Sequence, residues 1–256
     1  MTGQVLVQGL SAYILVFCRM GGMLFFNPLL ARKNVVSAVK IGLALGITLI
    51  LTPSLKSTGI AGLDGLAFLF AMLMEFMVGF AAGLIFQIFY YMLFAAGDII
   101  DMGFVISMAK AFDPGTNIQT SVSGKLFELL FVMYFFATDS HLTFIRIMAS
   151  SYDVVSMGAV EIGQDTAKFI MTLFVSAFVL IIKLVAPFVA ATFVIEVALG
   201  VLMKLSPQIN IFSIHFPLKI FAGLLLLFAF SVPVGNFMEN YVVIMMENLY
   251  KLFAVI

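Results

Sequence analysis

Long apolar blocks, in which polar residues are rare, make up most of the chain. A scan with a membrane-length window separates about six of them. They run over Val5–Phe26, Val35–Leu55, Leu66–Ala96, Leu126–Ile147, Phe169–Leu202 and Ile220–Phe237. About 20 predominantly apolar residues are enough for a helix to cross a bilayer. The pattern therefore predicts an all-α, polytopic membrane-type protein.

A seventh block, Val242–Ile256, is shorter and more polar than the others. Glu247 and Lys251 have the i, i+4 spacing of a helix ion pair, and Asn240 and Asn248 fall on roughly the same side. This block is expected to form an amphipathic or partner-packed helix.

Two of the blocks are longer than one bilayer crossing requires. Leu66–Ala96 and Phe169–Leu202 span about 31 and 34 residues, so they must tilt, kink or break into hairpins. Pro187 gives the second of them a cause for a break, because proline removes a backbone donor and clashes with the preceding turn. Gly42 and Gly46 form one small-residue pair that allows close helix packing, and Gly79 and Gly83 form another. We expect long, kinked helical hairpins.

Composition excludes a soluble domain. Of 256 residues, 63% are hydrophobic and only 10% are charged, whereas soluble domains carry roughly 25% charged residues. The net charge is zero, so no basic face for nucleic acid is expected. Cys18 is the single cysteine and cannot form an intrachain disulfide. No basic residue precedes Arg19, so no cleavable signal peptide is expected.

Six charged residues stand out inside the apolar blocks, and each would cost about 2.5–3.5 kcal/mol if it faced the centre of a lipid bilayer. They are Arg19, Lys40, Glu75, Glu128, Lys183 and Glu196. Three readings are open. The charges line an ion or proton path, they pair across the subunits of an assembly, or they snorkel from block ends, which fits Lys40 and Glu128 but not Glu75 or Lys183. Pairing across subunits is the favoured reading.

The stretch Gly97–Gly124 interrupts the apolar pattern with Asp98, Asp101 and the turn Asp113-Pro114-Gly115. Apolar residues are nevertheless spread through it, namely Phe104, Val105, Ile106, Met108, Phe112 and Ile118. It is either a surface loop with apolar anchors or a re-entrant constriction that apolar side chains close. Irregular backbone at membrane depth requires burial in protein or a cavity to line.

No pattern for catalysis is recognisable. His141 and His215 have no metal-ligand partner at helical spacing, and zinc-protease, serine-hydrolase and phosphate-loop motifs are absent from the sequence. Asp98 and Asp101 could share a helix face, but acids beside turn glycines more often cap a helix end. We expect no catalytic residue, no cofactor and no metal site, and therefore no enzyme.

Further landmarks follow one another in order along the chain. They are Arg19, Pro28 and Arg32-Lys33; Glu75, Gly79 and Gly83; Gly97, Asp101 and Gly103; Asp113-Pro114, Gln119 and Gly124; Asp139-Ser140-His141 before a helix that ends near Tyr152; Ala186-Pro187; Gly200; and a C-terminal signature with Pro207, Gln208, Asn210, Phe212, Pro217 and Lys219. In this order they resemble the FliR/SctT family, the R-type export-gate subunit of bacterial flagellar and type III secretion systems. Asn117, Ser140, Lys204 and His215 depart from the family's usual residues.

The resemblance implies bent helical hairpins that assemble with P-type and Q-type subunits into a helical export gate, which stands largely above the membrane plane. It implies a P-like part, residues 1–165, and a Q-like part, residues 166–256. The buried charges, here Arg19, Glu75, Asp101, Lys183 and Glu196, would then pair between neighbouring subunits. Further expected partners are the B-type switch subunit, the A-type export subunit, unfolded substrates and membrane lipid.

The implied function is a core subunit of the channel that passes unfolded flagellar proteins across the bacterial inner membrane, at the flagellar basal body. By position, Gly103–Gly124 matches the loop that plugs the closed channel. Its plug side chains would be Phe104, Val105, Ile106, Met108 and Phe112, and its hinges Gly103, Gly115 and Gly124. Asp113, Pro114 and Gln119 belong to the same plug loop.

Two alternatives belong to other functional classes. A secondary transporter could use Glu75, Asp98, Asp101 and Lys183 as a midplane proton or ion site, although the sequence shows no repeat halves. A passive scaffold could instead nucleate assembly without conducting anything.

Overall fold

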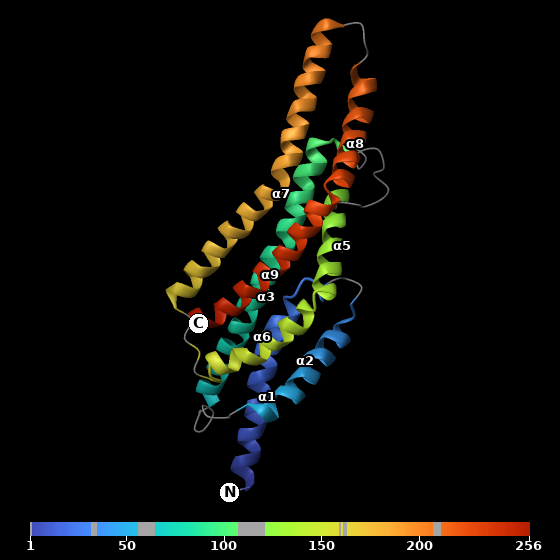
Figure 1. Cartoon of the computed structure of the whole chain (residues 1–256). Helices are drawn as coiled ribbons and strands as arrows, with labels where there is room; N and C mark the ends of the chain where they lie inside the picture. The colour runs from blue at the N-terminus through green and yellow to red at the C-terminus, as the bar shows by residue number, and fades with distance from the viewer. Residues whose placement is uncertain are drawn as a thin grey trace. The chain divides into compact units, whose positions relative to one another are not determined.

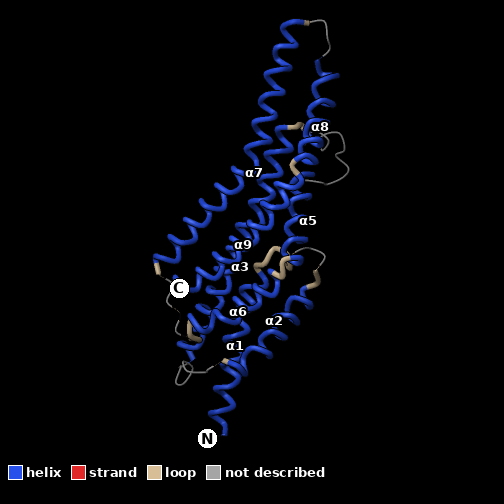
Figure 2. Tube along the Cα trace, in the orientation of Figure 1, coloured by secondary structure: helices blue, strands red, loops and turns tan. Residues whose placement is uncertain are grey.

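A computed structural model describes residues 2–31, 35–55, 65–106, 121–158, 160, 163–206 and 211–256, with side chains except at residues 2–8 and 211–213. Every regular element in this part of the chain is a helix, as the ribbon in Figure 1 and the trace in Figure 2 show. The all-α prediction is confirmed.

The helices follow the apolar blocks. In order they are α1 (Thr2–Phe25), α2 (Ser37–Leu51) with the short 3-10 turn η1 (Thr52–Ser54), α3 (Gly65–Gly103), α5 (Val122–Ala137), α6 (Ser140–Val154), α7 (Gln164–Leu205), α8 (Ile211–Ala229) and α9 (Ser231–Val255). Among the described residues, Ser37–Ser54, α3 and α7 are long and apolar enough to cross a membrane, and the bent pair α8 and α9 adds a fourth candidate if it is one span. The membrane-type prediction is confirmed.

The two longest helices are α3 with 39 residues and α7 with 42. At about 1.5 Å per residue they extend roughly 58 and 63 Å, about twice the hydrocarbon thickness of a bilayer. Pro187 lies inside α7 and does not end it. Of the outcomes that the sequence left open, a break into a hairpin at this proline is therefore wrong, because α7 continues through it, and a kink there stays a prediction.

Two predicted blocks each contain a turn. The block Leu126–Ile147 is divided between α5 and α6, because Asp139 adopts a left-handed backbone with φ 54°. The block Ile220–Phe237 is divided between α8 and α9, which meet at a 62° bend. The seventh block is the second half of α9 instead of a separate helix. Its predicted pair is confirmed, with Glu247 and Lys251 exposed and 3.7 Å apart.

The helices build two compact units. Unit 1 contains residues 1–89, 139–174 and 243–256, and unit 2 contains residues 90–138 and 175–242. The core of unit 1 includes Leu15, Met20, Met23, Val78, Phe86, Met148 and Leu249, and that of unit 2 includes Leu93, Phe127, Phe131, Phe188 and Met238. The division into P-like and Q-like parts stays a prediction, because it concerns similarity to other subunits and not contacts within the chain.

Large apolar side chains remain on the outside of both units. Phe70 is 61% exposed in unit 1, and Phe193 and Phe228 are 66% and 83% exposed in unit 2. Monomeric soluble proteins rarely expose broad apolar patches. This chain therefore presents surfaces suited to lipid or to other protein subunits.

Candidate functional site

In unit 2, the carboxylate of Asp101 joins the end of α3 to the start of α5. It accepts hydrogen bonds from the backbone N–H groups of Val122 and Ser123, at 2.6 and 3.3 Å, and from the Ser123 hydroxyl at 2.5 Å. The first turn of a helix has unpaired N–H groups and favours negative charge. Asp101 is buried and acts as an anionic clamp on α5.

Two glycines allow the helices to meet at this clamp. A Cβ atom on Gly97 of α3 would overlap the backbone of Gly124 in α5, so no larger residue fits there without movement. The Ser121 hydroxyl accepts from the Gly124 N–H at 3.1 Å and caps α5. The contact between α3 and α5 therefore combines three of the sequence landmarks, namely Gly97, Asp101 and Gly124.

The first residues of the predicted plug are anchored within unit 2. Phe104 is fully buried, and its ring lies where a Cβ on Gly223 of α8 would be, 2.7 Å from the ring's Cγ. Gly103 lies against Thr192 of α7, whose Cγ2 would be 3.0 Å from an added Cβ. Ile106 is also buried.

Val105 has a left-handed backbone with φ 62°, which is unusual for a β-branched residue. The other predicted plug residues, Met108, Phe112, Asp113, Pro114, Gly115 and Gln119, lie outside the described residues.

In unit 1, Arg19 of α1 and Glu75 of α3 form a fully buried ion pair, with Nε and Oε2 at 2.5 Å. The guanidinium also donates to the carbonyls of Ser151 and Val155 at 3.1 and 3.0 Å. It stacks on the Tyr152 ring, 4.1 Å from the ring centroid. The second Glu75 oxygen accepts from the Gly158 N–H at 2.9 Å. These contacts form one buried cluster that joins α1, α3 and the C-terminal end of α6. Its members are Arg19, Glu75, Ser151, Tyr152, Val155 and Gly158.

Tyr152 also fastens α6 to α1, because its hydroxyl donates to the Val16 carbonyl at 3.4 Å. Burial raises the pKa of the Tyr152 phenol above its usual range, which keeps this donor protonated.

Glycines bring α1 and α3 close beside this cluster. A Cβ on Gly79 would collide with the Arg19 carbonyl oxygen, and one on Gly22 would be 2.6 Å from the Phe76 carbonyl oxygen. A Cβ on Gly83 would be 2.7 Å from the Phe26 Cβ. The predicted close packing at Gly79 and Gly83 is confirmed. For Gly42 and Gly46 of α2 it is not found within the described part of the chain, because a Cβ on either would meet no atom within 4 Å.

Three other charges of the apolar blocks are only partly enclosed. Lys183 is exposed, Lys40 is half-buried, and Glu196 is exposed while its Oε1 accepts from the nearly enclosed Lys219 ammonium at 2.6 Å.

The sixth such charge, Glu128, is buried. It accepts from the Tyr90 hydroxyl at 2.8 Å and from the Lys125 ammonium at 2.6 Å.

Most of these charges therefore find partners inside the chain. Arg19, Glu75 and Asp101 have enclosed contacts with other parts of the same chain, and their predicted role as contacts between subunits stays a prediction. Lys183 and Glu196 are the exposed members of the predicted set. Their predicted role as subunit contacts stays a proposal.

The sequence did not pair Lys219 with Glu196, since they lie on different helices. Pro217 lies inside α8, and Phe212 lies in its first turn without a described side chain. Pro207, Gln208 and Asn210 lie outside the described residues.

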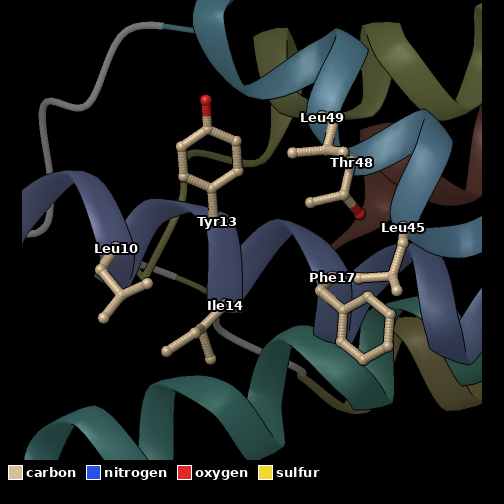
Figure 3. Close-up of a pocket in the computed structure, with 7 residues that line it drawn as sticks. All are labelled: Leu10, Tyr13, Ile14, Phe17, Leu45, Thr48 and Leu49. Atoms are coloured by element: carbon tan, nitrogen blue, oxygen red, sulfur yellow. The ribbon is translucent and has the colours of Figure 1, made fainter.

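Unit 1 also contains an apolar groove between α1 and α2, with a volume of about 420 Å³ (Figure 3). It is lined by Leu10, Tyr13, Ile14, Phe17, Leu45, Thr48 and Leu49. The Thr48 hydroxyl donates to the Ala44 carbonyl at 2.7 Å, so it is already used within α2. The groove suits an apolar group, and sequence reasoning did not find it because its lining comes from two helices.

No group of three or more histidine, cysteine, aspartate or glutamate side chains with the arrangement of a metal site occurs within the described ranges. The sites described above are clamps, ion pairs and close helix contacts. They can fix and release helices and segments of backbone.

Comparison with known proteins supplies the family. Residues 10–245 match the family described as bacterial export proteins, family 1. The chain is 24% identical over 239 residues to the flagellar biosynthetic protein FliR of Escherichia coli K12, covering 93% of this chain and 91% of that protein. It is 25% identical over 248 residues to FliR of Bacillus subtilis 168, covering 96% and 95%.

A secretion-system relative matches over a similar extent. The Yop proteins translocation protein T of Yersinia pestis is 22% identical over 259 residues, covering 100% of this chain and 99% of that protein. Because the family match extends over most of the sequence, the chain belongs to the bacterial export proteins, family 1, and its predicted FliR/SctT relationship is confirmed.

Proposed function

We propose that this protein is a core subunit of the flagellar type III export gate, and that with P-type and Q-type subunits it forms the inner-membrane channel for unfolded flagellar proteins. The observation that carries the proposal is the match over residues 10–245 to an export family, together with near full-length similarity to flagellar biosynthetic proteins. The B-type switch subunit, the A-type export subunit and membrane lipid are the further partners at the flagellar basal body.

The exposed apolar surface supports an assembly. The helices α3 and α7 are roughly twice as long as the hydrocarbon layer is thick. About half of each must therefore lie outside hydrocarbon or cross it at a steep tilt. Phe193, Val194 and Val197 of α7 are each more than half exposed. Neighbouring subunits would cover such side chains wherever lipid does not.

Within this proposal, Gly103–Gly124 is the plug of the closed channel. The Asp101 clamp supports this role, because it binds the end of the segment, at Val122 and Ser123, to a side chain just before the segment's start. A narrow apolar constriction stops ions by excluding water, yet yields to a threading polypeptide. Met108 and Phe112 would supply apolar side chains to it, with Gly103, Gly115 and Gly124 as hinges.

The test replaces residues 107–120 with a glycine-serine linker of equal length, which keeps Asp101, Ser121 and Ser123 in place. The purified export complex is inserted into planar bilayers and its ion conductance is measured. We expect the variant to leak small ions, because the apolar side chains are gone while the backbone remains. The same replacement of residues 56–64, between η1 and α3, is the control and should stay closed. Equal conductance in the 107–120 variant and the parent would contradict the plug assignment.

The transporter alternative finds little support in the side chains it needs. Glu75 is engaged by Arg19 and Gly158, and Asp101 is engaged by the start of α5. Solute uptake by the purified chain reconstituted without partners would favour that alternative. A passive scaffold is separated by crosslinking a stalled substrate, since only a conducting subunit should crosslink through residues 103–124.

A further inference from the structure

We propose that Gly223 of α8 leaves room for the Phe104 ring and so anchors the start of the predicted plug segment; we call this contact site the seat. Phe104 is then a positioning residue held in the seat, and not a side chain that blocks the channel. This inference rests on the proposed function, because it concerns how the same segment is held. It assigns a role to Gly223, which no sequence landmark singled out.

The contact between Phe104 and Gly223 is close on several atoms. A Cβ on Gly223 would be 2.7 Å from Phe104 Cγ, 2.9 Å from its Cβ and 3.1 Å from its Cδ1. Real Cβ atoms essentially never approach other heavy atoms within 3.0 Å, so the ring occupies the space that any other residue at 223 would need. Phe104 has no exposed surface. Its ring is therefore already used inside unit 2 and is not available to occlude a pore.

The backbone beside this ring is held in an uncommon conformation. Val105 has φ 62°, and its N–H donates to the Met102 carbonyl at 3.3 Å, while the Phe104 N–H donates to the Ile100 carbonyl at 3.0 Å. A β-branched residue in the left-handed region persists only where the surroundings determine it. Phe104, the preceding residue, is enclosed against Gly223, and Asp101, four residues earlier, is bound to the first turn of α5, so both fix the backbone that leads into Val105.

The seat therefore sets the direction in which the chain leaves α3. Gly103 packs on Thr192 of α7 and Phe104 packs on α8, so two helices hold two successive residues. If the ring leaves its seat, Val105 loses the contact that determines its left-handed backbone and relaxes to an extended one. The start of the plug segment then moves although its own sequence is unchanged.

The first test is Gly223→Ala in the export complex, with Gly200→Ala of α7 as the matched control. An added Cβ on Gly200 meets no atom within 4 Å, so both variants gain the same methyl group in a helix but only one displaces a side chain. Hydrogen exchange of the amides of residues 100–105 is measured together with ion conductance. We expect about tenfold faster exchange, as for loss of one local contact, and a leak in Gly223→Ala alone.

The second test is a double-mutant cycle with Phe104→Ala, which empties the seat and keeps Gly223. We expect this variant to show the same faster exchange and the same leak. Adding Gly223→Ala to it should change little further, because the ring that would clash is already absent. Unchanged exchange in Gly223→Ala, or effects that simply add in the double variant, would overturn the seat.

The outcomes separate the seat from the plug. If Gly223→Ala speeds exchange without a leak while the 107–120 linker variant does leak, the seat does not position the plug and this inference fails alone. If neither variant leaks, the plug assignment fails, while faster exchange still supports the contact between the ring and Gly223. If Gly223→Ala does not fold, Phe104→Ala decides the question, and normal exchange and conductance in that variant overturn the seat.

Val105→Gly provides an independent check, because glycine adopts positive φ without steric cost. We expect this variant to keep the parent's hydrogen exchange at the amides of residues 100–104. Val105→Pro cannot reach φ 62°, since the proline ring holds φ near −65°, and it should leak as Gly223→Ala does. A Val105→Pro variant that does not leak ions and whose amides exchange as slowly as the parent's would contradict the requirement for a left-handed backbone.

Discussion

The buried pair of Arg19 and Glu75 should be much less costly to remove as a pair than one partner at a time. Both side chains have no exposed surface, and Nε and Oε2 are 2.5 Å apart. Taking away one partner leaves the other charge enclosed and uncompensated, which costs about 3–5 kcal/mol. We therefore expect Arg19→Met and Glu75→Leu each to lower the free energy of unfolding by about that amount.

The structure indicates what the double variant would lose. The Ser151 carbonyl still accepts from the Val155 N–H at 2.9 Å, and Gly158 is partly exposed, so water can reach its N–H. The buried Val155 carbonyl loses the donor at 3.0 Å, which costs about 1–3 kcal/mol. The double variant should therefore be more stable than either single variant, by about 2 kcal/mol.

The assay is chemical unfolding of the purified protein in mixed micelles, followed by helical circular dichroism. The control is Glu247→Gln with Lys251→Gln in α9, an exposed pair at 3.7 Å that should contribute no more than about 0.5 kcal/mol. A double variant as unstable as the sum of its two single variants would refute the reasoning, because it would mean that the two charges do not compensate each other.

Three further outcomes are expected. Gly79→Ala should destabilise unit 1 by about 1–3 kcal/mol, because the new Cβ meets the Arg19 backbone. In the same unfolding assay Gly42→Ala should be neutral or slightly stabilising, because its Cβ has no atom within 4 Å. Asp101→Asn should weaken the clamp on α5 by about 1–2 kcal/mol, seen as faster hydrogen exchange in the first turn of α5; unchanged exchange would contradict the clamp. Asp139→Gly should change stability by only a few tenths of a kcal/mol, whereas Asp139→Val should cost about 1–2 kcal/mol, because only the latter resists φ 54°.

The sequence predicted the helices better than the turns between them. Apolar content alone located α1, α3 and α7 to within a few residues at most ends. The hydropathy window missed the turns at Asp139 and Phe230, because an average does not register one or two residues with non-helical backbone. Only the family resemblance placed the start of a helix near Asp139. Pro187 does not end α7, because a helix can continue past a proline by giving up a backbone hydrogen bond, so the residue type alone did not show whether the chain turns back there.

For the candidate sites, the sequence indicated which residues need partners but not who the partners are. The free-energy cost of exposing Arg19 and Glu75 to lipid correctly indicated that both charges need partners. Their pairing with each other depends on α1 lying against α3 at Gly22 and Gly79, which the sequence does not show. The Asp101 clamp was foreseen only as general helix capping. The seat at Gly223 carries no local signal, because it depends on where Phe104 lies after folding.

The Asp101 clamp also affects how well the fold tolerates insertions in the segment between α3 and α5. Because the carboxylate holds the first turn of α5 against the last turn of α3, the two ends of the intervening segment meet regardless of how many residues lie between them. Closing a flexible loop of twice the length costs only about 0.6 kcal/mol more. Insertions between residues 107 and 120 should therefore leave the fold of unit 2 intact, so that natural variation or protein engineering can alter this segment independently of the helices that carry it.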